Sequence, residues 1–213
     1  MVESLIEKKR IPSCWILSDG TIGMEIQSIA LAEALDLNYK KKLIKPYWLN
    51  RIFPSLANFR GIPPAAEFGE ILSLPAPNIL ITCGKRHAGA SIALKKRAKN
   101  LIYTIHIQDP RISSKYFDLL IIPEHDPSRG SNIITTKGSL NRITPSLLEN
   151  EARLFVKETQ KLKGKKVAVN IGGNTKNHTI DHIMIKKLVI SLNRFSIDNN
   201  CSLMITSSKR SSK

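Results

Sequence analysis

The sequence has few acidic and aromatic side chains, few cysteines and no long apolar run. No apolar stretch approaches the roughly 20 residues that a membrane-spanning helix needs, and the first eleven residues lack the apolar core of a signal peptide. The three cysteines lie far apart without a CxxC pair, each in an apolar run typical of a strand, which predicts buried, reduced thiols. We therefore expect a cytoplasmic protein with at most a peripheral contact with a membrane.

Lysine and arginine outnumber the acids, 33 to 17, which gives a formal net charge of +16. A charge of this sign suits nucleic acid, anionic lipid or phosphorylated substrates, and a biased amino-acid composition is the alternative explanation. The basic residues are scattered along the chain, and only 6% of the residues are aromatic. The stripe of cations interleaved with aromatic side chains that nucleic-acid binding favours is missing, which argues against that function.

Several motifs of well-known enzyme classes are absent. The sequence contains neither the dinucleotide-binding GxGxxG nor the phosphate-binding GxxxxGK[ST], and it has no GxSxG of a serine hydrolase. His178-x-x-x-His182 has a spacing that can bind a metal, but it lacks the glutamate of HExxH and an evident third ligand. We therefore predict no metal site.

The pattern of apolar residues predicts an α/β protein with a Rossmann-like parallel sheet. Nearly continuous apolar runs, such as 78–82 and 118–122, are typical of strands buried on both faces, and parallel sheets bury both faces. We expect further strands at about 14–19, 39–44, 100–107 and 132–136, with helices at about 24–37, 87–98 and 145–160. The stretch 46–77 holds six prolines and is expected to be a long connection with one or two short helices.

A second unit follows a charged break at 161–166. A strand at 166–171, a helix at 181–199 and a strand at 202–206 repeat the strand, glycine loop and helix of the first unit. We therefore divide the chain into an N-terminal Rossmann-like domain, 1–160, and the beginning of a second, incomplete Rossmann-like domain, 161–213. The alternative is that the later strands extend the first sheet.

Polar residues gather where the predicted strands end, the edge at which open α/β sheets bind ligands. Gly20-x-x-Gly23 before a helix would let a backbone approach an anion, although a tight strand-to-helix turn explains it equally well. Lys85 and Arg86 begin a predicted helix, where cations are unfavourable unless an anion binds; two solvated side chains are the alternative. His106 and Asp109 are candidate bases, or else core and turn residues.

These segments, taken in order, resemble a known family. Asp19-Gly20-x-x-Gly23-x-x-x-Gln27, Thr82-x-Gly84-Lys85-Arg86, His106-Ile107-Gln108-Asp109-Pro110-Arg111, Pro123-Glu124-His125-Asp126 and Asn170-Ile171-Gly172-Gly173 are similar to segments of the mitochondrial-fission "elongated mitochondria" family of bacteria and plants. The resemblance implies two domains similar to GT-B glycosyltransferases, with a site between them. Relatives continue well past this chain, so we expect a truncated form with half of that site.

The resemblance implies a metal-independent transferase that takes a nucleotide-sugar as donor and needs no other cofactor. His106 or Asp109 would then be the catalytic base. Gly172, Gly173 and Thr175 would face the donor diphosphate. The other ligand-binding residues expected are Asp19, Gly20, Gly23, Gln27, Gly84, Arg86, Gln108, Arg111 and Glu124. The alternative function is a non-catalytic adaptor that binds an acidic protein or an anionic membrane surface.

Overall fold

The chain folds into two compact units, Met1–Arg142 and Ile143–Lys213, here called the N-terminal and C-terminal units. The computed structural model describes residues 12–45, 76–174 and 179–208. Contacts therefore group the stretch 143–160 with the C-terminal unit, whereas the sequence pattern had joined it to the first domain. The prediction of short helices within 46–75 lies outside the described residues.

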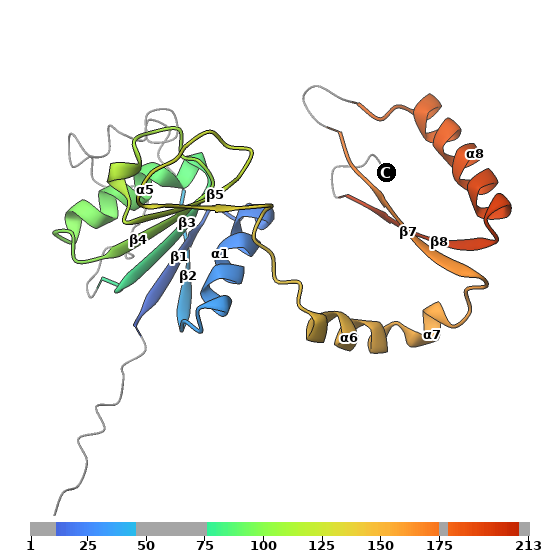
Figure 1. The fold of residues 1–213 in the computed structure, drawn as a ribbon, viewed down its shortest axis with the longest axis horizontal. Coiled ribbons are helices and arrows are strands. Elements are labelled where there is room, and N and C mark those ends of the chain that lie inside the picture. The colour runs from blue at the N-terminus through green and yellow to red at the C-terminus, as the bar shows by residue number, and fades with distance from the viewer. Residues whose placement is uncertain (1–11, 46–75, 175–178, 209–213) are drawn as a thin grey trace, which may run out of the picture. The chain divides into compact units, whose positions relative to one another are not determined.

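The N-terminal unit is built on a six-stranded, wholly parallel sheet in the order β2-β1-β3-β4-β5-β6 (Figure 1). The predicted α/β Rossmann-like fold is thus confirmed. The strands are β1 (Cys14–Ser18), β2 (Tyr39–Leu43), β3 (Ile79–Cys83), β4 (Tyr103–Ile107), β5 (Leu119–Pro123) and β6 (Ile133–Thr136).

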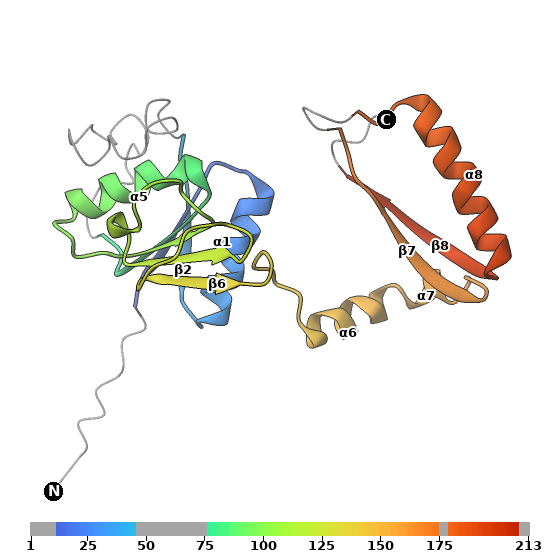
Figure 2. The same ribbon diagram turned by 45° about the horizontal axis from the view of Figure 1, so that its top comes forward.

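Helices cover both faces of this sheet, which is why its central strands are apolar on both sides. Helix α1 (Ile22–Ala34) packs on the face that carries Ile16 and Ile81. Helix α5 (Lys85–Arg97) packs on the other face, against Leu17 and Leu80 (Figures 1 and 2). Burying side chains of this size fully stabilises the fold by about 1.5–3 kcal/mol each.

A polar cluster joins three elements on the α5 side of the sheet. Asp118, just before β5, accepts hydrogen bonds from the Thr104 backbone N–H (2.8 Å) and hydroxyl (2.9 Å), and it forms an ion pair with Lys95 of α5 (2.7 Å). Burial raises the pKa of Asp118, but the hydrogen bonds from Lys95 and Thr104 outweigh it and leave the pKa below its usual value. The cluster therefore fixes α5 against β4 and β5.

The C-terminal unit contains α6 (Pro145–Leu154), α7 (Val156–Thr159), β7 (Lys165–Ile171), α8 (His182–Asp198) and β8 (Cys201–Ser207). Strands β7 and β8 pair in parallel as a separate two-stranded sheet, so they do not extend the first one. Thr144 caps α6 by accepting from the Leu147 N–H, and Asp181 caps α8 by accepting from the Met184 N–H.

Several element boundaries differ from the sequence prediction. Helix α1 ends at Ala34 rather than at 37, because Asp36 adopts φ 51° and turns the chain into β2. The single helix expected at 145–160 is interrupted at Phe155 and continues as α7. The cysteines are buried and unpaired as predicted. Within the described stretches, no helix is long and apolar enough to cross a membrane.

Candidate functional site in the N-terminal unit

The strand order reverses between β1 and β3. From β1 the chain moves outward to β2, whereas from β3 it moves the other way to β4, so α1 and α5 lie on opposite faces and diverge from this point. A crevice at the carboxyl ends of such a strand pair is where open α/β sheets bind ligands. The loop after β1 carries Asp19 and Gly20, and Gly84 follows β3.

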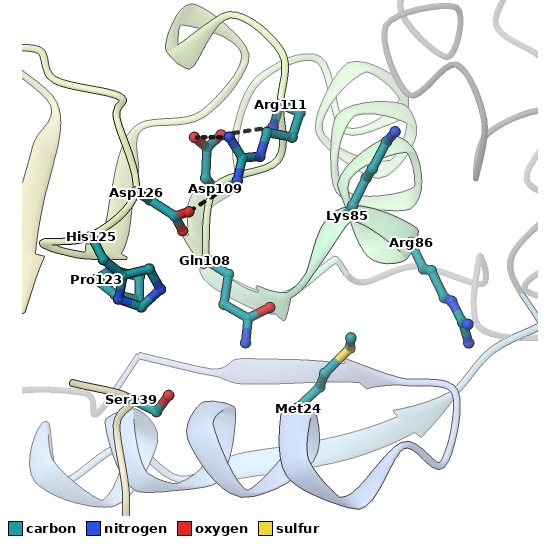
Figure 3. Close-up of a pocket in the computed structure, with 10 residues that line it drawn as sticks. All are labelled: Met24, Lys85, Arg86, Gln108, Asp109, Arg111, Pro123, His125, Asp126 and Ser139. Atoms are coloured by element: carbon teal, nitrogen blue, oxygen red, sulfur yellow. Dashed lines mark hydrogen bonds and ion pairs between the residues drawn. The ribbon is translucent and has the colours of Figure 1, made fainter. Parts of the chain in front are cut away.

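A cavity of about 810 Å³ opens at this edge of the sheet. Its walls come from the start of α1, the start of α5 and the loops that follow β4, β5 and β6 (Figure 3). Met24 from α1 and Gln108 from the loop after β4 extend into the same space. The lining residues are Met24, Lys85, Arg86, Gln108, Asp109, Arg111, Pro123, His125, Asp126 and Ser139.

Two cations occupy the first turn of α5, and that turn has no acidic residue. The amino end of a helix carries a partial positive charge, so Lys85 and Arg86 add to it rather than offset it. The Asp19 carboxylate lies 3.7 Å from the Arg86 guanidinium, and the Arg86 side chain is half exposed. Among the described residues, no carboxylate pairs with Lys85. The arrangement favours binding of an anion.

The loop after β4 brings a third cation to the cavity. Gln108 and Arg111 have φ of 71° and 60°, which side-chain-bearing residues seldom adopt. Asp109 holds this shape: one carboxylate oxygen accepts from the Arg111 backbone N–H (2.7 Å) and the other from the Ser128 hydroxyl (2.8 Å). Arg111 in turn donates to Asp126 (3.0 Å; Figure 3). Asp109 thus has both oxygens engaged and acts here as a loop-shaping acceptor.

His106, the other candidate base, is fully buried in β4 and does not line the cavity. Its Nδ1 shares a hydrogen bond with the Thr82 hydroxyl (2.8 Å), and its ring stacks on Phe117 (4.8 Å between centroids). Burial, together with the nearby His87, lowers its pKa to about 3. The environment is that of a neutral core side chain.

His87, which the sequence analysis did not single out, lies beneath this site. It is buried in the first turn of α5, and its Nδ1–H donates to the Cys83 carbonyl (2.6 Å). Its Nε2 makes no hydrogen bond within the described residues and faces Asp19 at 3.7 Å. Burial lowers the pKa of His87, and the hydrogen bond to Cys83 and the Asp19 carboxylate offset only part of that shift. In the sequence, the one sign that His87 is buried is its position in the first turn of a helix that follows a buried strand.

The glycines of the site differ in their surroundings. Gly20 and Gly23 have open space where a side chain would begin, which is compatible with a ligand approaching the backbone. Gly84, by contrast, is enclosed by the side chains of Met24 and Gln108. The Gln27 amide is buried and donates to the Gly23 carbonyl (3.1 Å), so it supports the helix start.

The remaining predicted residues do not line this cavity. The side chain of Glu124 is exposed, and its backbone carbonyl accepts from Arg129. Gly172 and Gly173 follow β7 in the C-terminal unit, while Thr175 and His178 lie outside the described residues. In the described stretches, no cluster of three or more His, Cys, Asp or Glu residues could hold a metal ion. Arg86, Gln108, Asp109 and Arg111 are the predicted residues that the cavity brings together.

The described residues form a Rossmann-like α/β fold with a cavity at the carboxyl ends of its strands, and Lys85, Arg86 and Arg111 are among the residues that line it. The profile of the family described as Mitochondrial fission ELM1 matches residues 22–213, and the chain belongs to that family. Over 113 residues it is 30% identical to "Uncharacterized protein RP120" of Rickettsia prowazekii (strain Madrid E), covering 53% of this chain and 32% of that protein.

A second relative is "Mitochondrial fission protein ELM1" of Arabidopsis thaliana, which is 26% identical over 160 residues. That match covers 64% of this chain and 37% of the plant protein. The chain therefore spans about a third of the length of the curated relatives it matches. No solved structure matches the chain.

Proposed function

We propose that this chain binds a nucleotide-sugar through its phosphate groups and takes part in glycosyl transfer. The observation that carries the proposal is the pair Lys85 and Arg86, placed at the amino end of α5 in the wall of a cavity at the strand-order reversal. A diphosphate there would offset two side-chain charges and the partial charge of the helix end.

The size and composition of the cavity support a ligand of this class. About 810 Å³ falls within the range of small-molecule sites, roughly 300–1,000 Å³. Arg86 offers a planar donor group that suits phosphate oxygens, and Arg111, which also pairs with Asp126, lines the same cavity. Gln108 and Ser139 add neutral hydrogen-bonding groups in the same walls, as recognition of sugar or ribose hydroxyls requires. Cations around a diphosphate also stabilise it as a leaving group without a metal.

Thermal unfolding of the full chain with UDP-, GDP-, ADP- and CMP-sugars tests the binding step. A ligand at 100 times its Kd adds about 2.7 kcal/mol to the free energy of unfolding, which gives a readily measured shift. We expect one of these nucleotide-sugars to shift the transition, and we expect Lys85→Gln/Arg86→Gln to abolish the shift.

Lys96→Gln/Arg97→Gln is the matched control, because it removes the same charge from the other end of the same helix. It should retain the shift. An equal loss in both double variants would show a net-charge effect and refute the assignment of the site. No shift with any nucleotide-sugar in a cooperatively folded wild-type chain would refute donor binding. Release of nucleoside diphosphate from the binding nucleotide-sugar then tests transfer separately.

A further inference from the structure

A second hollow, of about 550 Å³, lies at the opposite edge of the sheet from the cavity. Helix α5 starts at the carboxyl end of β3 and returns to the amino end of β4, so its last turn lies at the edge where the strands begin. Three parts of the chain form the hollow: the last turn of α5, the loop that joins α5 to β4, and the 3₁₀ helix η2 (Ser114–Tyr116). Its polar lining residues are Lys95, Lys96, Asn100, Lys115, Tyr116 and Asp118.

Positive charge dominates this region. The stretches 95–100 and 115–118 contain five cationic residues and one carboxylate, Asp118. That carboxylate is already paired with Lys95 at 2.7 Å. Cations are favourable at the carboxyl end of a helix, and this explains the basic residues in the last turn of α5. Lys115 comes from a different element, η2, and adds to the charge around the same hollow.

Exposed apolar side chains adjoin the cations. Leu101, the residue after Asn100, is 82% exposed, and Tyr103 at the start of β4 is 48% exposed. Lys99 and Asn100 have φ of 51° and 62°, which makes a tight turn with Leu101 directly after it. An exposed leucine and tyrosine among lysines are the composition of surfaces that bind at the membrane interface, where apolar groups enter and cations meet headgroups.

We propose that this surface, the basic edge formed by residues 95–103 and 115–116, binds the surface of an anionic phospholipid membrane. A headgroup phosphate occupies the hollow between Lys95, Lys96 and Lys115. Leu101 and Tyr103 enter the headgroup region beside it. The basic edge is separate from the cavity at the carboxyl ends of the strands, so the two proposals stand or fall independently.

Sedimentation with phosphatidylcholine vesicles, with and without phosphatidylglycerol, tests this proposal on the full chain. We expect binding only when phosphatidylglycerol is present, and release at high ionic strength. A cation near an anionic membrane changes the partition coefficient roughly fivefold, so Lys96→Gln/Lys115→Gln should weaken binding roughly 25-fold. Leu101→Ser, made in the wild-type chain, should also weaken vesicle binding. It should leave the circular dichroism unchanged, because the Leu101 side chain is largely exposed.

Lys40→Gln/Lys137→Gln is the matched control, since both lysines are exposed and lie outside the basic edge. It should bind nearly as well as the wild type. Equal weakening in the two double variants would mean that net charge alone drives the association, and the proposed surface would be wrong. Wild-type protein that stays in the supernatant, or Leu101→Ser that binds as tightly as the wild type, would also overturn it.

Discussion

Replacing Gly84 with alanine should destabilise the N-terminal unit and disturb its cavity together. Gly84 has φ 81° and ψ 153°, a conformation that is essentially restricted to glycine and costs roughly 1–3 kcal/mol for other residues. A Cβ at this position would lie 2.7 Å from the Met24 sulfur and 3.4 Å from the Gln108 amide oxygen. Met24 is flexible, so a rotamer change relieves that contact for about 1 kcal/mol.

Alanine also restricts the unfolded chain more than glycine does, which lowers the entropy lost on folding. This stabilises the variant by about 0.4–1 kcal/mol and offsets part of the cost. We therefore expect Gly84→Ala to lose about 2 kcal/mol, or roughly 6 °C in the melting temperature of a unit of this size. Urea denaturation followed by circular dichroism measures it. Gly138→Ala is the control, because open space surrounds that position, and it should change stability by less than about 0.5 kcal/mol. A Gly84→Ala protein as stable as this control would refute the argument from backbone strain.

Three further predictions concern titratable side chains in or beside the sheet. Burial lowers the pKa of His106 to about 3, whereas an unfolded histidine has a pKa near 6.5. Between these two pH values the unfolded chain binds a proton at His106 that the folded chain does not. The free energy of unfolding should therefore fall as the pH drops from about 6.5 toward 3, by up to about 1.4 kcal/mol per pH unit. Urea midpoints at several pH values should show this slope, which flattens in His106→Gln and persists in the exposed His125→Gln. Asp118→Asn should lose about 1 kcal/mol with an unchanged denaturant slope, since it weakens a part-buried acceptor of three hydrogen bonds. Burial raises the pKa of Cys14 to about 11 and that of Cys83 to about 12, so mass spectrometry should find neither alkylated until the protein unfolds.

The strands of the sheet could be predicted because their burial leaves a direct trace in the sequence. Leu119 to Ile122 are apolar without interruption, as a strand covered on both faces requires, and β5 is found there. The ends of α1 and α6 could not be predicted as well. Where such a helix ends depends on single backbone torsions, such as φ 51° at Asp36. The spacing of apolar residues along the sequence does not predict these torsions.

The edge of the sheet at which the cavity opens could be predicted, but the contacts of the side chains around it could not. Arg86, Gln108 and Arg111 come together because they follow parallel strands, whose carboxyl ends meet at one edge. The part that Asp109 plays depends on Ser128, a partner 19 residues away that no local pattern indicates. His106 lies in a strand whose two faces are both buried, so its alternation with Ile105 and Ile107 could not tell a core position from a reactive one.

The outermost strand on the β1 side of the sheet carries three consecutive lysines. Within the described stretches, β2 pairs with β1 alone, and Lys40, Lys41 and Lys42 lie along it. Edge strands are templates on which a second molecule can continue a sheet, and the first step toward fibrils is often such an addition. Two copies that approached through β2 would bring six lysines together, although Lys41 of each copy is paired with Glu25. These three lysines thus protect the chain against polymerisation through that strand.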